Sequence, residues 1–156
     1  MTSVEASSSW ALAGGAQPPR LPEGVDLPRD RMLVMGILNV TPDSFSDGGR
    51  FLDPGAALDH AQEMLDEGAD LVDLGGESTR PNSTRISEDE EWERIGSIIQ
   101  RLAASGVVVS VDTLHALTAR RAADVGAAII NDVSGGRWDS QMNAAVASTS
   151  CAYVIQ

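Results

Sequence analysis

Short runs made mostly of apolar residues alternate along this chain with longer segments in which apolar residues recur every three or four positions. Runs of this length predict strands, and the lack of polar alternation in the first of them favours burial on both faces. The longer segments have the helical period. Strands that alternate with helices in this way predict βαβ units and a parallel sheet. The apolar runs cover residues 33–38, 69–74, 107–111, 127–130 and 152–155.

Capping residues indicate where the predicted helices begin and end. Asp53 followed by Pro54 is typical of an N-cap and the first helical position, and Gly68 is a typical helix end. Ser87 and Glu90 fit a capping box at the start of a second helix. This helix is predicted to end at residues 105–106, a third near residue 125, and a short fourth should cover residues 140–147.

One sequence pattern occurs three times, as GADLVD (68–73), GVVVSVD (106–112) and GAAIIND (126–132). Each copy has a Gly that ends a helix, an apolar strand, and an Asp or Asn where the strand ends. Two architectures contain such units, an open doubly wound sheet and a (β/α)₈ barrel. The chain lacks a G-x-G-x-x-G fingerprint after the first strand and a P-loop. Polar residues end each of the first four strands, which favours the barrel.

The length of the chain limits how much of a barrel it can form. A complete barrel takes ~250 residues, so this chain should hold about four and a half units of a TIM-type barrel, an incomplete one. Residues 1–30 are rich in Ser, Ala, Gly and Pro and predict a disordered leader, followed by a partial barrel domain over residues 31–156.

Charge and hydropathy restrict the class of partner. The chain has 156 residues with 11 basic and 23 acidic side chains, a net charge of −12, and every basic residue is Arg. This balance argues against binding to nucleic acid or to an anionic membrane. No apolar run approaches the ~18 residues of a membrane span, and no secretory signal is evident. We expect a cytoplasmic protein.

Five polar residues at the ends of successive strands are the candidates for chemistry: Asn39, Asp73, Asp112, Asn131 and Asp132. Each alone could be a turn-former, but as a set they favour a site, because the strand ends of a barrel meet at one mouth. A carboxylate there could act as a general base, hold Mg²⁺, or accept two parallel hydrogen bonds from an amidine-like edge, as in a 2-amino-4-oxo-pyrimidine ring.

Two further groups of residues have weaker signals. Arg80 is the best candidate for an anion ligand, with a solvated loop Arg as the alternative. His60 and His115 have no Ser or Cys partner in the pattern, so neither is assigned a catalytic role.

Four segments resemble successive motifs of dihydropteroate synthase. They are MGILNVTPDSFSDGG (35–49), VDLGGESTRPNSTR (72–85), VSVDT (109–113) and IINDVSGG (129–136), and the resemblance runs from Met32 to the end of the chain. It implies a (β/α)₈ barrel that joins 6-hydroxymethyl-7,8-dihydropterin diphosphate to p-aminobenzoate, releases pyrophosphate, uses Mg²⁺ and forms homodimers.

The resemblance also implies roles for particular residues. Asp112 and Asn131 would bind the pterin ring, and Asn39 would bind Mg²⁺ or the diphosphate. Arg80 would meet the diphosphate. The p-aminobenzoate pocket, where sulfonamides also bind, would include Phe45, Thr79 and Pro81. No residue is assigned a catalytic role in the strict sense.

Part of the family pattern does not occur in this sequence. The missing features are a further pterin-binding Asp, a Lys and an Arg/His pair that grips the pyrophosphate; the chain contains no Lys at all. We therefore expect the 156-residue chain alone to have little or no synthase activity. Two alternatives are a pterin-binding methyltransferase-type barrel fragment and a non-catalytic truncated product.

Overall fold

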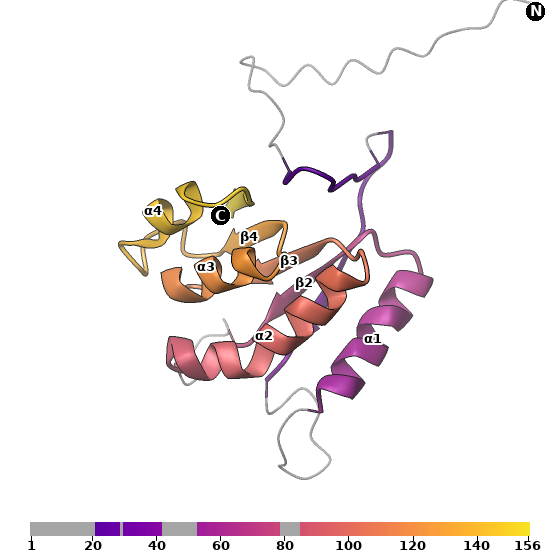
Figure 1. The fold of residues 1–156 in the computed structure, drawn as a ribbon, viewed down its shortest axis with the longest axis horizontal. Coiled ribbons are helices and arrows are strands. Elements are labelled where there is room, and N and C mark those ends of the chain that lie inside the picture. Colours follow the sequence, from indigo (N-terminus) through magenta and orange to yellow (C-terminus); the bar gives the residue numbers. More distant parts are fainter. Residues whose placement is uncertain (1–20, 29, 42–52, 79–84) are drawn as a thin grey trace, which may run out of the picture.

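The computed structural model describes residues 21–28, 30–41, 53–78 and 85–156. Strands and helices alternate through these ranges (Figure 1). The elements are β1 (Met35–Asn39), α1 (Pro54–Asp66), β2 (Leu71–Gly75), α2 (Glu88–Ala104), β3 (Val109–Asp112), α3 (Ala116–Asp124), β4 (Ile129–Asp132), α4 (Met142–Ala147) and β5 (Ala152–Ile155). No helix in the described ranges is both long and apolar enough to cross a membrane.

All five strands are parallel, and their order in the sheet is β1-β2-β3-β4-β5. Each strand therefore pairs with the next one along the chain. A doubly wound sheet reverses its strand order at a switch point, whereas a barrel adds every unit on the same side. The consecutive order confirms the predicted (β/α) units of a TIM-type barrel. Over the described residues the sheet is open, with β1 and β5 at its two edges.

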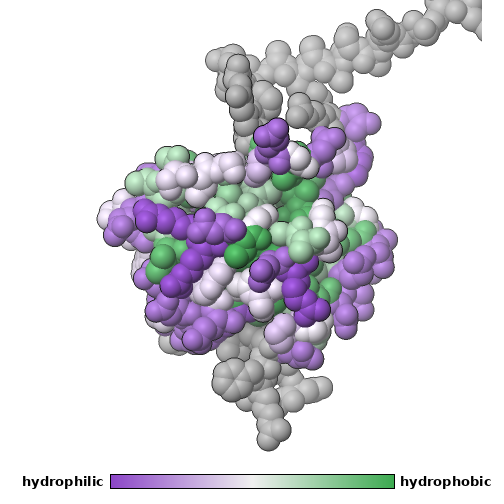
Figure 2. Space-filling view, viewed as in Figure 1, coloured by the Kyte–Doolittle hydropathy of each residue, from purple (hydrophilic) through white to green (hydrophobic). Residues whose placement is uncertain are grey.

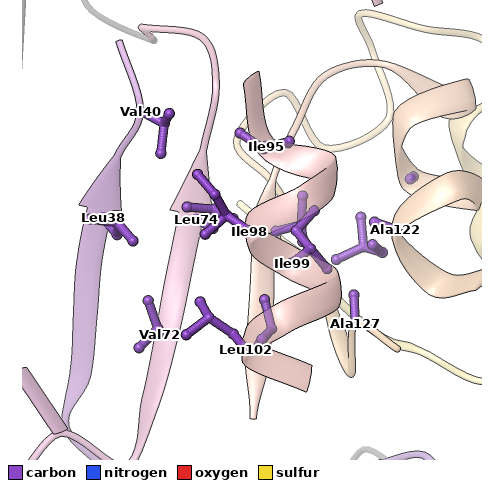
Figure 3. Packing of buried hydrophobic residues seen from close by; sticks show 14 of the residues in the cluster. Leu38, Val40, Val72, Leu74, Ile95, Ile98, Ile99, Leu102, Ala122 and Ala127 are labelled. Carbon is purple, nitrogen blue, oxygen red and sulfur yellow. The ribbon is translucent and has the colours of Figure 1, made fainter. Parts of the chain in front are cut away.

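The helices cover one face of the sheet and enclose the core there (Figure 1). Because side chains alternate between faces along a strand, every second strand residue points to this side. Leu38, Val72 and Leu74 meet Ile99 and Leu102 of α2 in this layer, and all five are at most 4% exposed (Figure 3). In the same view, the surface that the helices turn to solvent is mostly hydrophilic (Figure 2).

The alternate strand residues lie on the face without helices, and β1 shows what this means for burial. Met35 and Ile37 are 43% and 63% exposed. The predicted burial of both faces is therefore wrong for β1, because nothing in the described chain packs on its open face. In β2, the next strand, every residue from Leu71 to Gly75 is buried.

The predicted helix starts are confirmed by their caps. Asp53 Oδ1 accepts a hydrogen bond from the Gly55 N–H at 2.9 Å, and Ser87 Oγ accepts one from the Glu90 N–H at 3.2 Å. These contacts pair backbone N–H groups that a helix start otherwise leaves without partners.

The strands within the repeated sequence pattern, β2, β3 and β4, begin two residues later than predicted. In each copy the glycine has a positive φ, and the N–H of the next residue bonds to a carbonyl in the last helical turn. The first apolar residue of each run thus completes the helix end rather than starting the strand. These bonds are Ala69 N–H to Met64 O (2.9 Å), Val107 N–H to Leu102 O (3.1 Å) and Ala127 N–H to Ala122 O (2.9 Å).

The chain before β1 contacts the amino ends of the strands. Leu21 and Val25 pack against a small apolar cluster that includes Leu71, Ile129 and Ala152. Residues 21–25 therefore belong structurally with the sheet. The division of the chain at residue 30 and the disordered leader stay predictions.

Candidate functional site

One rung of the sheet, close to the carboxyl ends of the strands, carries three of the five polar residues that the sequence singled out. In register across the five strands lie Asn39, Gly75, Asp112, Asn131 and Val154. Residues paired in this way point to the same face, here the face without helices. The structure thus brings Asn39, Asp112 and Asn131 together at one edge of the open face.

Gly75 lies on this rung between Asn39 and Asp112 and has no side chain of its own. A side chain at this position would place its Cβ 3.5 Å from Asn39 Oδ1 and 3.7 Å from Asp112 Oδ2. The glycine therefore keeps the space between the two oxygens open. A flat group that entered this space would meet oxygen atoms on both sides.

A second buried contact joins the rung to the residues below it. Asn131 Nδ2 donates a hydrogen bond to Asp73 Oδ2 at 3.0 Å, although β3 lies between their two strands. Among the described residues, three buried polar atoms on this face have no hydrogen-bond partner: Asp73 Oδ1, Ser110 Oγ and Asp112 Oδ1. A buried unpaired polar atom costs about 1–3 kcal/mol, and such groups are typical of sites that bind a ligand or water.

Asp112 is the residue of this rung whose pKa is shifted by its surroundings. Burial, and then the negative charges of Asp73, Glu91 and other neighbouring carboxylates, raise the pKa of Asp112 to about 7. Its carboxyl therefore gains or loses a proton close to neutral pH. A ligand that donates hydrogen bonds to this group favours its ionised form and offsets the repulsion.

The turn that follows β3 is held by a carboxylate that the sequence analysis did not single out. Thr113 Oγ1 donates to Glu91 Oε2 at 2.8 Å and accepts from the His115 N–H at 3.1 Å. Glu91 is fully buried on α2, and burial raises its pKa. Its helical spacing from Ile95 and Ile99 was a signal that could have found it, because it puts a charged residue on the apolar face of α2.

Glu77, after β2, is a second buried carboxylate that the sequence analysis did not single out. It accepts a hydrogen bond from Arg85 and lies 3.3 Å from His115 Nε2. Arg85 in turn lies over the Trp138 ring, 4.7 Å from its centroid. This group of side chains ties the end of β2 to the start of α3 and to the loop after β4.

Asp132, which the sequence grouped with the site residues, holds the loop after β4 instead. It accepts hydrogen bonds from the Ser134 N–H (2.8 Å), the Gly136 N–H (2.7 Å) and the Tyr153 hydroxyl (2.9 Å). Burial opposes its ionisation, but these donors prevail and lower the pKa of Asp132. With its oxygens engaged, this carboxylate acts as a turn-former, the alternative that the sequence left open.

Several predicted site residues lie outside the described residues: Phe45, Thr79, Arg80 and Pro81. Their roles toward p-aminobenzoate and the diphosphate stay predictions.

The rung of Asn39, Gly75, Asp112 and Asn131, called the open rung below, supplies only part of what Mg²⁺ requires. No three His, Cys, Asp or Glu side chains in the described ranges form a group that could hold a metal. Asn39 offers an amide oxygen beside the space that Gly75 leaves open. Mg²⁺ often keeps several waters and takes few protein ligands besides substrate phosphates. The residues present therefore fit a Mg²⁺ that is shared with a phosphate group and do not form a complete protein cage.

Residues 35–156 match the model of a family described as pterin binding enzyme. The chain belongs to the pterin-binding enzyme family. The match begins at the first residue of β1 and includes every strand and helix of the described structure.

Relatives of this pterin-binding family member are dihydropteroate synthases, as the sequence motifs predicted. The enzyme from Mycobacterium leprae is 52% identical over 122 residues, which are 78% of this chain and 43% of the relative. A dihydropteroate synthase from Clostridium difficile, solved in the presence of pteroic acid, is 43% identical with a TM-score of 0.77. That match covers 81% of this chain and 48% of the other.

A third comparison is with another dihydropteroate synthase that was solved with a small molecule. The Xanthomonas albilineans dihydropteroate synthase, solved with 4-aminobenzoic acid, is 46% identical with a TM-score of 0.75, over 81% of this chain and 46% of the other. The resemblance predicted from the sequence is confirmed by these matches. The pterin-binding chain spans about half the length of the relatives that it matches.

Proposed function

We propose that this chain provides the pterin-binding half of a dihydropteroate synthase site. The reaction joins 6-hydroxymethyl-7,8-dihydropterin diphosphate to p-aminobenzoate and gives 7,8-dihydropteroate and pyrophosphate. The observation that carries the proposal is the open rung, where Asp112 and Asn131 stand side by side in register and Asp112 Oδ1 is buried without a partner among the described residues. The likeness of the chain to known dihydropteroate synthases supports it.

The pterin ring presents an N–H and an NH₂ group side by side on one edge. Asp112 can accept both hydrogen bonds with its two oxygens, which is a strong, charge-assisted arrangement. Asn131 adds a further polar contact from the neighbouring strand. Because Gly75 has no side chain, there is space for a flat ring between Asp112 and Asn39.

The diphosphate end of the substrate is assigned to Asn39, with Mg²⁺ beside it, and to Arg80. When bound, Mg²⁺ would supply positive charge that stabilises the leaving diphosphate. Asn39 would hold that group at the carboxyl end of β1, while Asp112 anchors the ring and thereby orients the bond to be broken. Phe45, Thr79 and Pro81 are proposed for the p-aminobenzoate pocket.

Turnover by the 156-residue chain alone is expected to be slow or absent. Ile37, the residue next to Asn39 on the open face of β1, is 63% exposed, so water reaches the open face beside the proposed ring site. The absence of Lys from the sequence removes one cation that the family resemblance implies. Homodimer formation and a cytoplasmic location are further parts of the proposal.

Binding of 6-hydroxymethylpterin, measured by isothermal titration calorimetry, tests the ring site. We expect the chain to bind this probe and Asp112→Asn to weaken it by about tenfold or more, because a charge-assisted bidentate contact is lost. Asp124→Asn is the matched control, since Asp124 is exposed on α3. Equal affinity in the wild type and Asp112→Asn would contradict the proposal.

A second assay separates the synthase from a methyltransferase-type barrel. Retention of p-aminobenzoate that depends on pyrophosphate is expected only for the synthase. Binding of pterin without any such retention would favour the alternative.

A further inference from the structure

We propose that Asp73 is a positioning residue that sets the orientation of the Asn131 amide, so that the open rung offers hydrogen-bond acceptors to its ligand. This inference depends on the proposed function only for the identity of the ligand. It concerns a residue that touches Asn131 and lies one layer below the ring site.

Asp73 was predicted at the end of its strand, but β2 continues to Gly75, so Asp73 lies in the middle of β2, in register with Ile37 and Ser110. It is only 5% exposed, so its carboxylate is shielded from bulk water. Asn131 Nδ2 reaches it across β3 with a 3.0 Å hydrogen bond. Ser110, the neighbour of Asp73 on β3, has no partner for its hydroxyl within the described chain and so does not compete for this bond.

The chemistry of the two groups decides which way the amide points. An ionised carboxylate only accepts hydrogen bonds, whereas an amide has an NH₂ donor on one side and an oxygen acceptor on the other. The reversed amide would place Asn131 Oδ1 against Asp73 Oδ2, two acceptors without a proton between them. Asp73 therefore keeps the Nδ2 side toward itself and directs Asn131 Oδ1 elsewhere.

The oxygen side of the Asn131 amide contacts Gln156, whose own amide could pair with either orientation of Asn131, so the carboxylate of Asp73 alone fixes the orientation. Asn131 Oδ1 accepts a hydrogen bond from Gln156 Nε2 at 3.3 Å. Gln156 is an exposed side chain, so an incoming NH₂ group can displace this long contact at low cost. The amide of Gln156 thus marks the place where a donor of the ligand would sit.

With the amide in this orientation, Asn131 and Asp112 both present hydrogen-bond acceptors at this rung. Asn131 Oδ1 and Asp112 Oδ1 belong to residues in register on β4 and β3, and Asp112 Oδ1 is buried with no partner among the described residues. Such a surface selects a ring edge that carries donors. It disfavours a ring of the same shape with a carbonyl oxygen in place of the amino group, because two acceptors would then face each other.

Two flat probes of nearly identical shape test this selection. They are 2-amino-4-oxopteridine, which has the amino group, and 2,4-dioxopteridine, which has oxygen there. Wild-type chain should bind the amino compound at least about tenfold more tightly, since the oxygen compound leaves buried acceptors unpaired. Titration calorimetry gives both dissociation constants and their ratio.

Asp73→Asn is the informative variant, because an amide at position 73 accepts either orientation of Asn131. We expect the ratio between the two probes to fall about threefold or more, with the weaker binding confined to the amino compound. Asp124→Asn, the same chemical change on the exposed side of α3, is the matched control and should leave the ratio unchanged. A loss of affinity that is equal for both probes would mean a merely structural role and would overturn the inference.

The double variant Asp73→Asn with Asn131→Asp keeps the net charge and restores the pattern. The new amide at position 73 can then donate to one oxygen of the new carboxylate at position 131, which leaves the other oxygen as an acceptor for the ligand. The preference for the amino compound should recover relative to Asp73→Asn alone. If it stays at the level of the single variant, the inference fails.

A measurement without ligand separates this inference from the proposed function. In ¹⁵N-labelled chain the Asn131 side-chain NH₂ protons should exchange slowly with water and shift in Asp73→Asn. If wild type binds neither probe, the proposed function fails for this chain and these resonances still decide the role of Asp73. Fast exchange in the wild type, or resonances unchanged by Asp73→Asn, would overturn it.

Discussion

The two faces of the sheet differ sharply although the same strands build them. On the helix-covered face Leu38, Val72 and Leu74 are at most 1% exposed and lie in one continuous apolar cluster. The positions between them, on the open face, include Ile37, which is 63% exposed, and the buried carboxylate of Asp73. Residues that are neighbours in sequence therefore have opposite surroundings.

This difference shows how stability and ligand recognition are divided by the two-residue period of a strand. Apolar burial on the helix side supplies the favourable free energy of folding. The open side carries acceptors at Asp73, Ser110 and Asp112 that have no partner in the described chain, each of which costs free energy without a ligand. The packed face thus offsets the cost of a polar site on the other face.

The largest expected effect comes from a cavity on the packed face. Leu74→Ala removes a fully buried side chain next to α2 and should lower the free energy of unfolding by about 2–5 kcal/mol. Ile37→Ala, on the neighbouring strand but on the open face, should change it by about 0.5 kcal/mol or less. Thermal and urea unfolding followed by circular dichroism measure both. Equal losses would contradict the division between the faces.

The next effect has the opposite sign and belongs to the open face. The pKa of Asp112 is about 7 in the folded chain against an ordinary value of 3.8, so between these values the folded chain holds a proton that the unfolded chain has released. Folding stability therefore decreases as pH rises through this range. Asp112→Asn removes that loss and should stabilise the chain by about 1–3 kcal/mol near pH 8, after allowance for solvent screening.

The gain from Asp112→Asn should shrink as the pH is lowered toward about 4, where the wild-type carboxyl is increasingly protonated in both states. Melting temperatures across this range check it, with Asp124→Asn on the exposed side of α3 as the control. A gain that does not depend on pH would point to a cause other than the carboxyl charge.

An effect of similar size is expected at the contact between α2 and the turn after β3. Thr113→Val keeps the side-chain shape but removes the hydroxyl that donates to Glu91, and should cost about 1–3 kcal/mol because a buried carboxyl loses its partner. Glu91→Gln keeps an oxygen for Thr113 and should cost less. Urea unfolding of both variants gives the comparison. The reverse ranking would show that the charge of Glu91, and not its contact with Thr113, matters.

The smallest effect is expected on the solvent side of the helices. Arg121→Gln removes an exposed ion pair with Asp89 on α2 and should change stability by about 0.5 kcal/mol or less. The same urea titrations provide the value. A loss as large as that of Leu74→Ala would show that the outer surface of the helices, too, holds the fold together.

Much of the fold could be predicted because its signals are local. The Asp53 and Ser87 caps act within three residues of chain, and the apolar runs mark every strand. The strand starts were predicted two residues early because a helix end and a strand start share the residues after Gly68 and its equivalents. Backbone hydrogen bonds decide whether these residues belong to the helix end or to the strand, and the hydropathy pattern does not show those bonds.

The candidate site could be predicted in part. The positions of Asn39, Asp112 and Asn131 at strand ends followed from the pattern, and the register then placed them on one rung. The hydrogen bond from Asn131 to Asp73 could not be predicted, because 58 residues separate the two in the chain. Asp132 shows the reverse case, since a strand-end carboxylate proved to hold its own loop.

The sequence by itself determined the alternation of strands and helices, the helix caps and the family of this protein, because each depends on residues close together in the chain. The tertiary structure alone decided the exposure of Ile37 beside the burial of Leu38, the contact of Asn131 with Asp73, and the raised pKa of Asp112. These properties depend on which strands become neighbours and on how much water their packing excludes. Periodicity along a chain specifies neither.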